Sequence, residues 1–126
     1  MRRMIGRWVI LLGLLGALWC QAVLAVDFMN DVKPLLSRLG CNGSSCHGKA
    51  EGQNGFKLSV FGADPRGDYH SILKEARGRR ITQAAPEASL FLRKATGEVG
   101  HGGGVRLQKG SREYRVLHDW IRGGLT

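Results

Sequence analysis

Residues 41–47 carry the side chains best suited to chemistry, namely Cys41, Cys46 and, directly after the second cysteine, His47. Two closely spaced thiols followed by a histidine are typical of a covalent attachment site for c-type haem. The thiols add to the two vinyl groups of the porphyrin, and the histidine is carried beneath the ring, where it can bind the iron. The usual motif has two residues between the cysteines, and this chain has four. We therefore predict one haem, attached through Cys41 and Cys46, with His47 as the proximal ligand.

His101 is the residue that we expect to fill the sixth position of that iron. It lies in a glycine-rich loop ahead of the last predicted helix, where glycines let the backbone approach a flat ring closely. Met29 is the only methionine after residue 25, and it precedes both cysteines. His70, His118 and an open position are the alternatives. A pair of histidines gives a lower potential than a histidine and a methionine, so we expect a low-potential haem.

Two arginines, Arg79 and Arg80, could bind a haem propionate, because a guanidinium pairs with a carboxylate through two hydrogen bonds. The alternative is a solvated pair of surface charges.

Zinc is an alternative metal for this part of the chain. By ligand count it matches Cys41, Cys46, His47 and His101, although an adjacent cysteine and histidine rarely reach one tetrahedral ion. Nothing in the sequence combines a nucleophile, a base and an orienting group, so we do not expect an enzyme.

The first 25 residues have the features of an export signal. Three arginines precede an apolar run, and Val23-Leu24-Ala25 offers small residues for cleavage before Val26. Residues 8–26 are also long enough to anchor the chain in a membrane if cleavage does not occur. Both interpretations place residues 26–126 outside the cytoplasm, in the periplasm or an equivalent compartment. A Cys41–Cys46 disulfide is an alternative to haem in such an oxidising compartment.

The composition is basic and rich in glycine. The chain has 19 Lys and Arg against 10 Asp and Glu, and 19 glycines in 126 residues. A basic surface can steer an acidic partner or lie near anionic lipid, or it can simply be solvated. An exported chain without a basic-aromatic motif is not expected to bind nucleic acid. The glycines indicate long loops, because few can lie inside helices.

The apolar spacing predicts helices joined by these loops. The first helix is expected to have Asn30 as its N-cap and to end at Gly40. The others are expected at residues 69–78, at residues 86–97, and after an N-cap at Ser111, with a short extended segment at residues 56–60. Trp120 and Tyr114 are predicted to be core residues between the first and last helices.

Several short motifs follow one another along the chain: Phe28-Met29-Asn30-Asp31-Val32-Lys33-Pro34-Leu35-Leu36, Gly40-Cys41-Asn42, Cys46-His47-Gly48, Asn54-Gly55-Phe56-Lys57-Leu58-Ser59, Asp64-Pro65, Gly78-Arg79-Arg80-Ile81, Pro86-Glu87-Ala88-Ser89-Leu90 and Trp120-Ile121. Read together and in this order, they resemble the planctomycete-type cytochrome c module, in its variant with four residues between the cysteines. The resemblance covers residues 26–126. It implies an all-α, cytochrome c-like fold in which the first and last helices cross, with long glycine-rich loops.

The sequence thus predicts an exported monohaem cytochrome that passes electrons to or from a redox partner protein of unknown identity. Residues 1–25 are the expected signal peptide and residues 26–126 the expected haem domain. The main alternative is a haem-free interaction module held by a Cys41–Cys46 disulfide. An open-site haem sensor is a third hypothesis.

Overall fold

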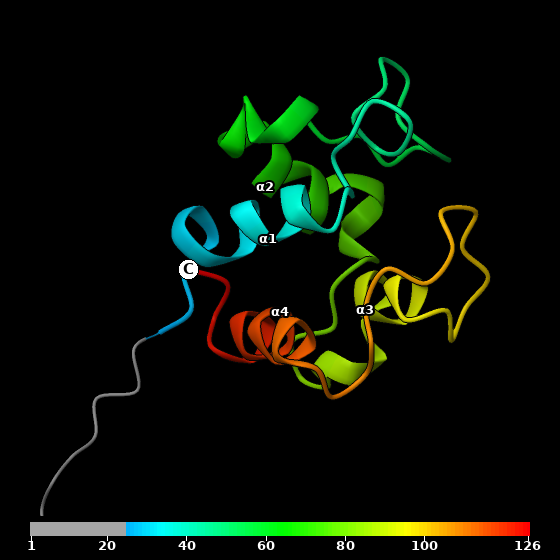
Figure 1. Cartoon of the computed structure of the whole chain (residues 1–126). Coiled ribbons are helices and arrows are strands. Elements are labelled where there is room, and N and C mark those ends of the chain that lie inside the picture. The colour runs from blue at the N-terminus through cyan, green and yellow to red at the C-terminus, as the bar shows by residue number, and fades with distance from the viewer. Residues whose placement is uncertain (1–24) are drawn as a thin grey trace, which may run out of the picture.

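The computed structural model describes residues 25–126, in which helices are joined by long loops and no strand is formed (Figure 1). The all-α class predicted from the sequence is confirmed for this part of the chain. The α-helices are α1 (Lys33–Arg38), α2 (Pro65–Leu73), α3 (Leu90–Ala95) and α4 (Arg112–Arg122). A π-helical turn, Phe28–Val32, leads into α1, and 3₁₀ turns lie at Val60–Gly62, Glu75–Gly78 and Pro86–Ala88.

The N-terminal helical segment begins earlier than the sequence predicted. Asp27, and not Asn30, is its N-cap: the Asp27 carboxylate accepts a hydrogen bond from the Asn30 backbone N–H at 2.8 Å, and the Asp31 carboxylate accepts one from the Asp27 N–H at 2.8 Å. This reciprocal pairing satisfies two N–H groups that a helix start leaves free. The predicted end at Gly40 is confirmed, with Gly40 at φ 75°.

Helix α4 packs against this N-terminal segment and ties the two ends of the described chain together. The predicted Ser111 cap is confirmed, since its hydroxyl accepts from the Tyr114 N–H at 3.1 Å. The rings of Phe28 and Trp120 lie 5.6 Å apart between their centroids. The Trp120 indole N–H and the Phe28 backbone N–H both donate to the carbonyl of Thr126, at 3.0 and 2.8 Å.

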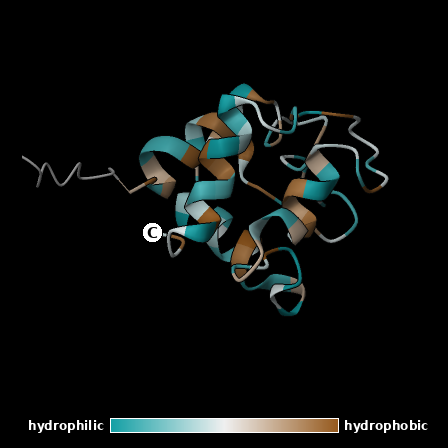
Figure 2. Ribbon diagram, turned by 90° about the horizontal axis from the view of Figure 1, so that it is seen from below, coloured by the Kyte–Doolittle hydropathy of each residue, from teal (hydrophilic) through white to brown (hydrophobic). Residues whose placement is uncertain are grey.

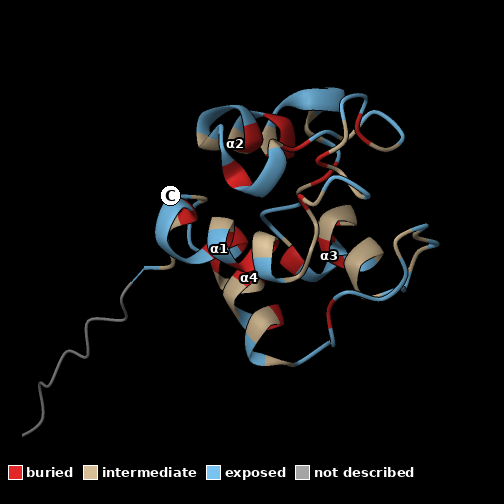
Figure 3. Ribbon diagram, turned by 45° about the horizontal axis from the view of Figure 1, so that its top comes forward, coloured by how far each residue is buried: buried red, intermediate tan, exposed pale blue. Residues whose placement is uncertain are grey.

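A single apolar core joins the helices. Each helix carries both apolar and polar residues (Figure 2), and buried residues lie on the helices and also on the loops that connect them (Figure 3). The core residues are Phe28, Val32, Leu35, Leu36, Leu58, Ile72, Leu92, Leu107, Tyr114, Leu117, Trp120 and Ile121. The core placement predicted for Tyr114 and Trp120 is therefore confirmed.

The bounds of two predicted helices differ from those that their apolar spacing suggested. Helix α2 begins at Pro65, ahead of the predicted start at residue 69, and it ends at Leu73, since Ala76 and Arg77 have φ values of 51° and 60° and cannot continue it. Helix α3 begins only at Leu90, since Ser89 adopts an extended conformation. The segment at residues 56–60, predicted as a short strand or extended segment, forms no ladder; Phe56 pairs with Gln53 in an isolated bridge, and Ser59 is extended.

The predicted leader (residues 1–25) and the alternative anchor (residues 8–26) lie outside the described residues except for Ala25 and Val26. No helix within residues 25–126 has the length and apolar character needed to cross a bilayer.

Candidate functional site

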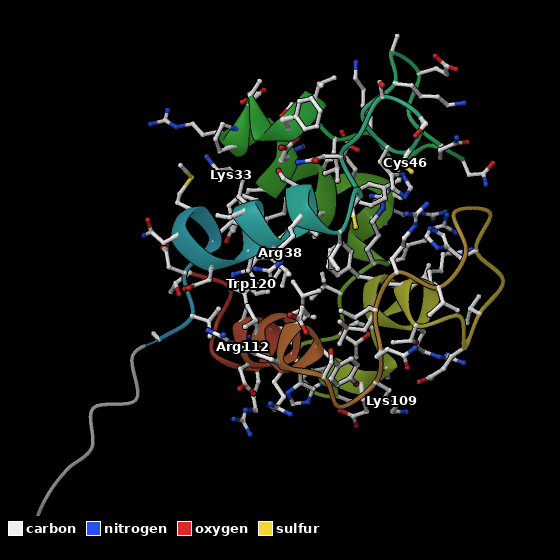
Figure 4. All side chains as sticks on the ribbon, viewed as in Figure 1. Lys33, Arg38, Cys46, Lys109, Arg112 and Trp120 are labelled. Atoms are coloured by element: carbon white, nitrogen blue, oxygen red, sulfur yellow. The ribbon has the colours of Figure 1, made fainter. Side chains whose placement is uncertain are left out.

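A cavity of about 500 Å³ brings together every residue that the sequence singled out for the site: Cys41, Cys46, His47, Arg79, Arg80 and His101. Its volume is within the range of roughly 300–1,000 Å³ found for small-molecule and cofactor sites. The loop after α1 and the loop after α3 lie on the same side of the molecule (Figure 1), and Cys46 lies in the first of them (Figure 4). The apolar side chains that line it are Leu36, Leu39, Phe56, Leu58, Leu90, Phe91, Ala95 and Leu117, and the further polar ones are Ser45, Gln53, Asn54, Lys94 and Arg106.

The end of α1 delivers Cys41 to this cavity. Gly40 adopts the left-handed conformation, the Cys41 N–H donates to Leu36 O at 2.9 Å and the Gly40 N–H donates to Ser37 O at 3.0 Å. These are the two hydrogen bonds of a Schellman motif, in which glycine is preferred because it has no Cβ. Cys41 therefore leaves the helix in a defined direction.

The four residues between the cysteines fold into a compact turn. The His47 N–H donates back to Cys41 O at 3.1 Å, and the Gly48 N–H donates to Gly43 O at 3.0 Å. A Cβ on Gly48 would lie 2.2 Å from the Asn42 carbonyl oxygen, so only glycine fits there. The longer spacing is thus absorbed locally, and both cysteines still line one cavity.

Both thiols are free, and neither forms a disulfide in the structure. Burial raises the pKa of the Cys41 thiol to about 11, and the nearby Cys46 adds to this effect. Cys41 is therefore protonated at neutral pH. The thiolate is the nucleophilic form of cysteine, so this raised pKa lowers the reactivity of Cys41 in the folded protein.

His47 presents one ring nitrogen to the cavity because the other is occupied. Its Nδ1 lies 2.9 Å from Phe56 O, so the neutral ring donates its Nδ1–H to this carbonyl and leaves Nε2 free. A hydrogen bond of this kind fixes the tautomer of metal-binding histidines. Burial also lowers the pKa of His47, which favours the neutral ring that a metal requires.

The turn that carries Phe56 was not predicted as part of the site, although its signal was present. Asn54 and Gly55 have φ values of 49° and 73°, both positive, as the central residues of a type I′ turn must be. An Asn-Gly pair is the strongest short-range signal for such a turn. The turn places the Phe56 carbonyl against His47, and the two rings lie 4.4 Å apart.

His101 lies opposite His47 in the same orientation. Its Nδ1 is 2.8 Å from Gly104 O, so Nε2 is again the free nitrogen. The two imidazole centroids are 6.1 Å apart and their planes differ by 12°. A metal–imidazole bond is about 2.0–2.1 Å and the ring centre lies roughly 1.1 Å beyond the nitrogen, so two ligands in line across one metal have centroids about 6.2 Å apart. The observed centroid spacing of 6.1 Å is close to this value, and the two ring planes are stacked nearly parallel.

Two cationic residues that the sequence analysis did not select hold the loop that carries His101. Lys94 Nζ donates to Gly100 O at 2.8 Å, and Arg106 Nε donates to Gly103 O at 2.8 Å. Both side chains also line the cavity. They were missed because a lone Lys or Arg in a basic chain carries no signal by itself.

The predicted arginine pair divides into two different roles. Arg79 is exposed and lines the cavity, and its side chain makes no hydrogen bond or ion pair with another described residue, so its guanidinium is available. Arg80 is only 5% exposed, and both of its terminal nitrogens donate to backbone carbonyls. The propionate role stays a prediction for both, and Arg79 is the one whose donors are unengaged.

The other histidines and Met29 do not line the cavity. His70 is exposed, and His118 Nδ1 lies 3.2 Å from the Asp119 carboxylate. Met29 is 47% exposed on the N-terminal segment. Among residues 25–126, no three His, Cys, Asp or Glu side chains are grouped as an ion bound by protein ligands alone would require.

Comparison with protein-family models, with curated proteins and with solved structures finds no match to this chain. The functional assignment therefore depends on the chemistry of the cavity. Two free thiols, two imidazoles with nearly parallel planes and several apolar side chains line one cavity, and residues of these kinds hold c-type haem.

Proposed function

We propose that this protein is an exported monohaem c-type cytochrome that transfers electrons. Cys41 and Cys46 would form the two thioether bonds, and His47 and His101 would bind the iron. The haem supplies the one-electron chemistry, and the protein supplies the ligands, the apolar walls and the export route. Under this proposal residues 1–25 are the signal peptide, and the partner is a separate redox protein.

The observation that carries the proposal is the arrangement of His47 and His101. Each ring has its Nδ1 engaged by a backbone carbonyl, and the two nearly parallel rings have a centroid distance of 6.1 Å, close to the value calculated for two ligands of one metal. Two surface histidines without a shared role are not expected to combine these Nδ1 contacts and nearly parallel planes beside two free cysteines. The ligand pair implies a low-potential haem, because two histidines, and no methionine sulfur, would bind the iron.

The packing of α4 against the N-terminal segment supports the finer fold proposal. The sequence motifs resemble those of planctomycete-type cytochrome c modules, in which the first and last helices cross. The contact of Phe28 with Trp120 joins the corresponding parts of this chain. We propose a cytochrome c-like fold on this basis.

Haem retention after denaturation tests the proposal. The full chain is exported from a host that has a haem-attachment system, alkylated, and separated on a denaturing gel that is stained for haem peroxidase activity. We expect a stained band for the natural protein and none for a Cys41→Ser/Cys46→Ser variant. An unstained natural protein whose two cysteines are linked by a disulfide would overturn the proposal and indicate the haem-free module.

A further inference from the structure

Arg80 is a buried cation whose contacts lead to the proximal histidine. Its Nη2 donates to Gly55 O at 2.7 Å, and its Nη1 donates to Ser71 O at 2.8 Å and to Glu75 O at 3.2 Å. One planar guanidinium thus connects the end of α2 to the Asn54-Gly55 turn. Lysine could not make these contacts, because a single ammonium cannot reach carbonyls on two sides at once.

The same guanidinium lies over the Phe56 ring, with its central carbon 4.5 Å from the ring centroid. Phe56 is the residue whose carbonyl accepts the hydrogen bond from His47 Nδ1 at 2.9 Å. Arg80 therefore contacts the turn at two neighbouring residues. It donates a hydrogen bond to the carbonyl of Gly55, and it makes a cation–π contact with the ring of Phe56. Such contacts stabilise by roughly 0.5–2 kcal/mol, more when they are buried.

We infer that Arg80 is a positioning residue, which fixes the tautomer of His47 by holding the Phe56 carbonyl in place. A neutral histidine that loses its Nδ1 acceptor favours the tautomer with the proton on Nε2. That proton would occupy the nitrogen that must bind iron. Arg80 thus keeps Nε2 available without contacting the iron or the ring of His47 through a hydrogen bond of its own. The inference rests on the proposed function only where it says that Nε2 is kept available for iron. The tautomer of His47 itself exists without haem.

Nitrogen-15 NMR of the histidine side chains in the haem-free full chain tests the inference directly. We expect the natural protein to hold His47 with its proton on Nδ1. In Arg80→Met the turn is released, and the His47 signals should shift toward the Nε2–H tautomer. Arg80→Lys keeps the positive charge but loses the planar set of guanidinium donors, so its His47 signals should shift in the same direction. This variant decides the question if Arg80→Met does not fold.

Arg66→Met is the matched control, because Arg66 is an exposed arginine of α2 that does not line the cavity. It should give the natural His47 signals. Natural signals in Arg80→Lys or in folded Arg80→Met would overturn the inference. A natural protein that holds the Nδ1–H tautomer but never acquires haem would contradict the proposed function and leave the role of Arg80 intact.

In the haem-loaded protein, the electron paramagnetic resonance spectrum gives a second readout that a loss of stability alone would not change. Low-spin ferric g-values depend on the angle between the two imidazole planes, which is 12° between His47 and His101. Arg80→Lys should broaden or shift these g-values, and Arg66→Met should not. Unchanged g-values in Arg80→Lys would contradict a positioning role in the loaded state.

Discussion

His47 and His101 lie across one cavity with their ring centroids 6.1 Å apart and their planes nearly parallel. They come from two loops that are far apart in sequence, and each ring is held by a carbonyl of its own loop. Both rings are therefore held in the cavity by hydrogen bonds within their own loops. Under the proposed function, ligands held in this way would lose less conformational entropy on binding, which would favour haem capture ahead of thioether formation.

Replacing His101 by alanine should open the sixth position of the iron. We expect His101→Ala to retain covalent haem and to change from a low-spin to a high-spin spectrum, because only His47 then remains as an axial ligand. Its ferrous form should bind carbon monoxide rapidly. His118→Ala is the control, since His118 does not line the cavity. A low-spin His101→Ala protein would show that another residue is the sixth ligand.

Replacing Gly52 by alanine should disturb the carbonyl that orients His47. Gly52 has φ 66°, and a Cβ there would lie 2.5 Å from Phe56 O. Gly55 has φ 73° and open space around its Cβ position, so Gly55→Ala is a matched control. Both variants should lose about 1–2 kcal/mol from left-handed backbone strain. Gly52→Ala should lose more, measured by urea unfolding of the haem-free protein, and equal losses would contradict this account.

The stability of the haem-free protein should fall at acidic pH partly through His47. Burial lowers the pKa of His47 in the folded state, so its contribution is present above the unfolded value of about 6.5 and is lost as the pH falls through the folded pKa. Urea unfolding at pH 7.5 and pH 5 measures the change. His47→Asn, which does not titrate, should lose less stability over this range than the natural protein. An equal or greater loss in His47→Asn would contradict the prediction.

Cys41 should react slowly with alkylating reagents while the haem-free protein is folded. Burial raises the pKa of its thiol to about 11, and the thiolate is the reactive form. We expect the rate of alkylation at Cys41, followed by peptide mass spectrometry, to rise steadily as the pH approaches 11. Protein unfolded in urea should react much faster at pH 8. Equal rates in folded and unfolded protein would show that Cys41 is not protected.

Removing the Phe28 ring should weaken the contact between the N-terminal segment and α4. Phe28 is 4% exposed and contacts both Trp120 and Tyr69. Truncation of a buried Phe to Ala typically costs about 3–5 kcal/mol. Its neighbour Met29 is 47% exposed, so Met29→Ala should cost much less. Thermal unfolding of both variants measures the difference, and similar losses would argue against this contact as part of the core.

Local signals in the sequence were enough to predict that helices form in four parts of the chain and to select six residues that line the cavity. Ser111 and Gly40 marked helix boundaries that the structure confirms, because capping depends on neighbouring atoms only. Asn30 was wrong as a cap because Asp27, one residue ahead of the apolar pattern, pairs with Asp31. The end of α2 was missed because Ala76 and Arg77 adopt positive φ values that their residue types do not signal.

The contacts that complete the site depend on tertiary structure and could not be predicted. The carbonyls of Phe56 and Gly104 have no sequence signature, yet they decide which nitrogen of each histidine faces the cavity. Arg80 was selected for a propionate, and its buried bonds to three carbonyls became visible only when α2 and the Asn54-Gly55 turn were placed together.

The intact mass of the exported protein tests the central claim most directly. We predict that the natural chain, cleaved after Ala25, is heavier than residues 26–126 by the mass of one haem, and that this addition survives denaturation and alkylation. The Cys41→Ser/Cys46→Ser variant should lack it. A natural protein that is instead lighter by two hydrogens than its reduced chain would carry a Cys41–Cys46 disulfide and would contradict the account.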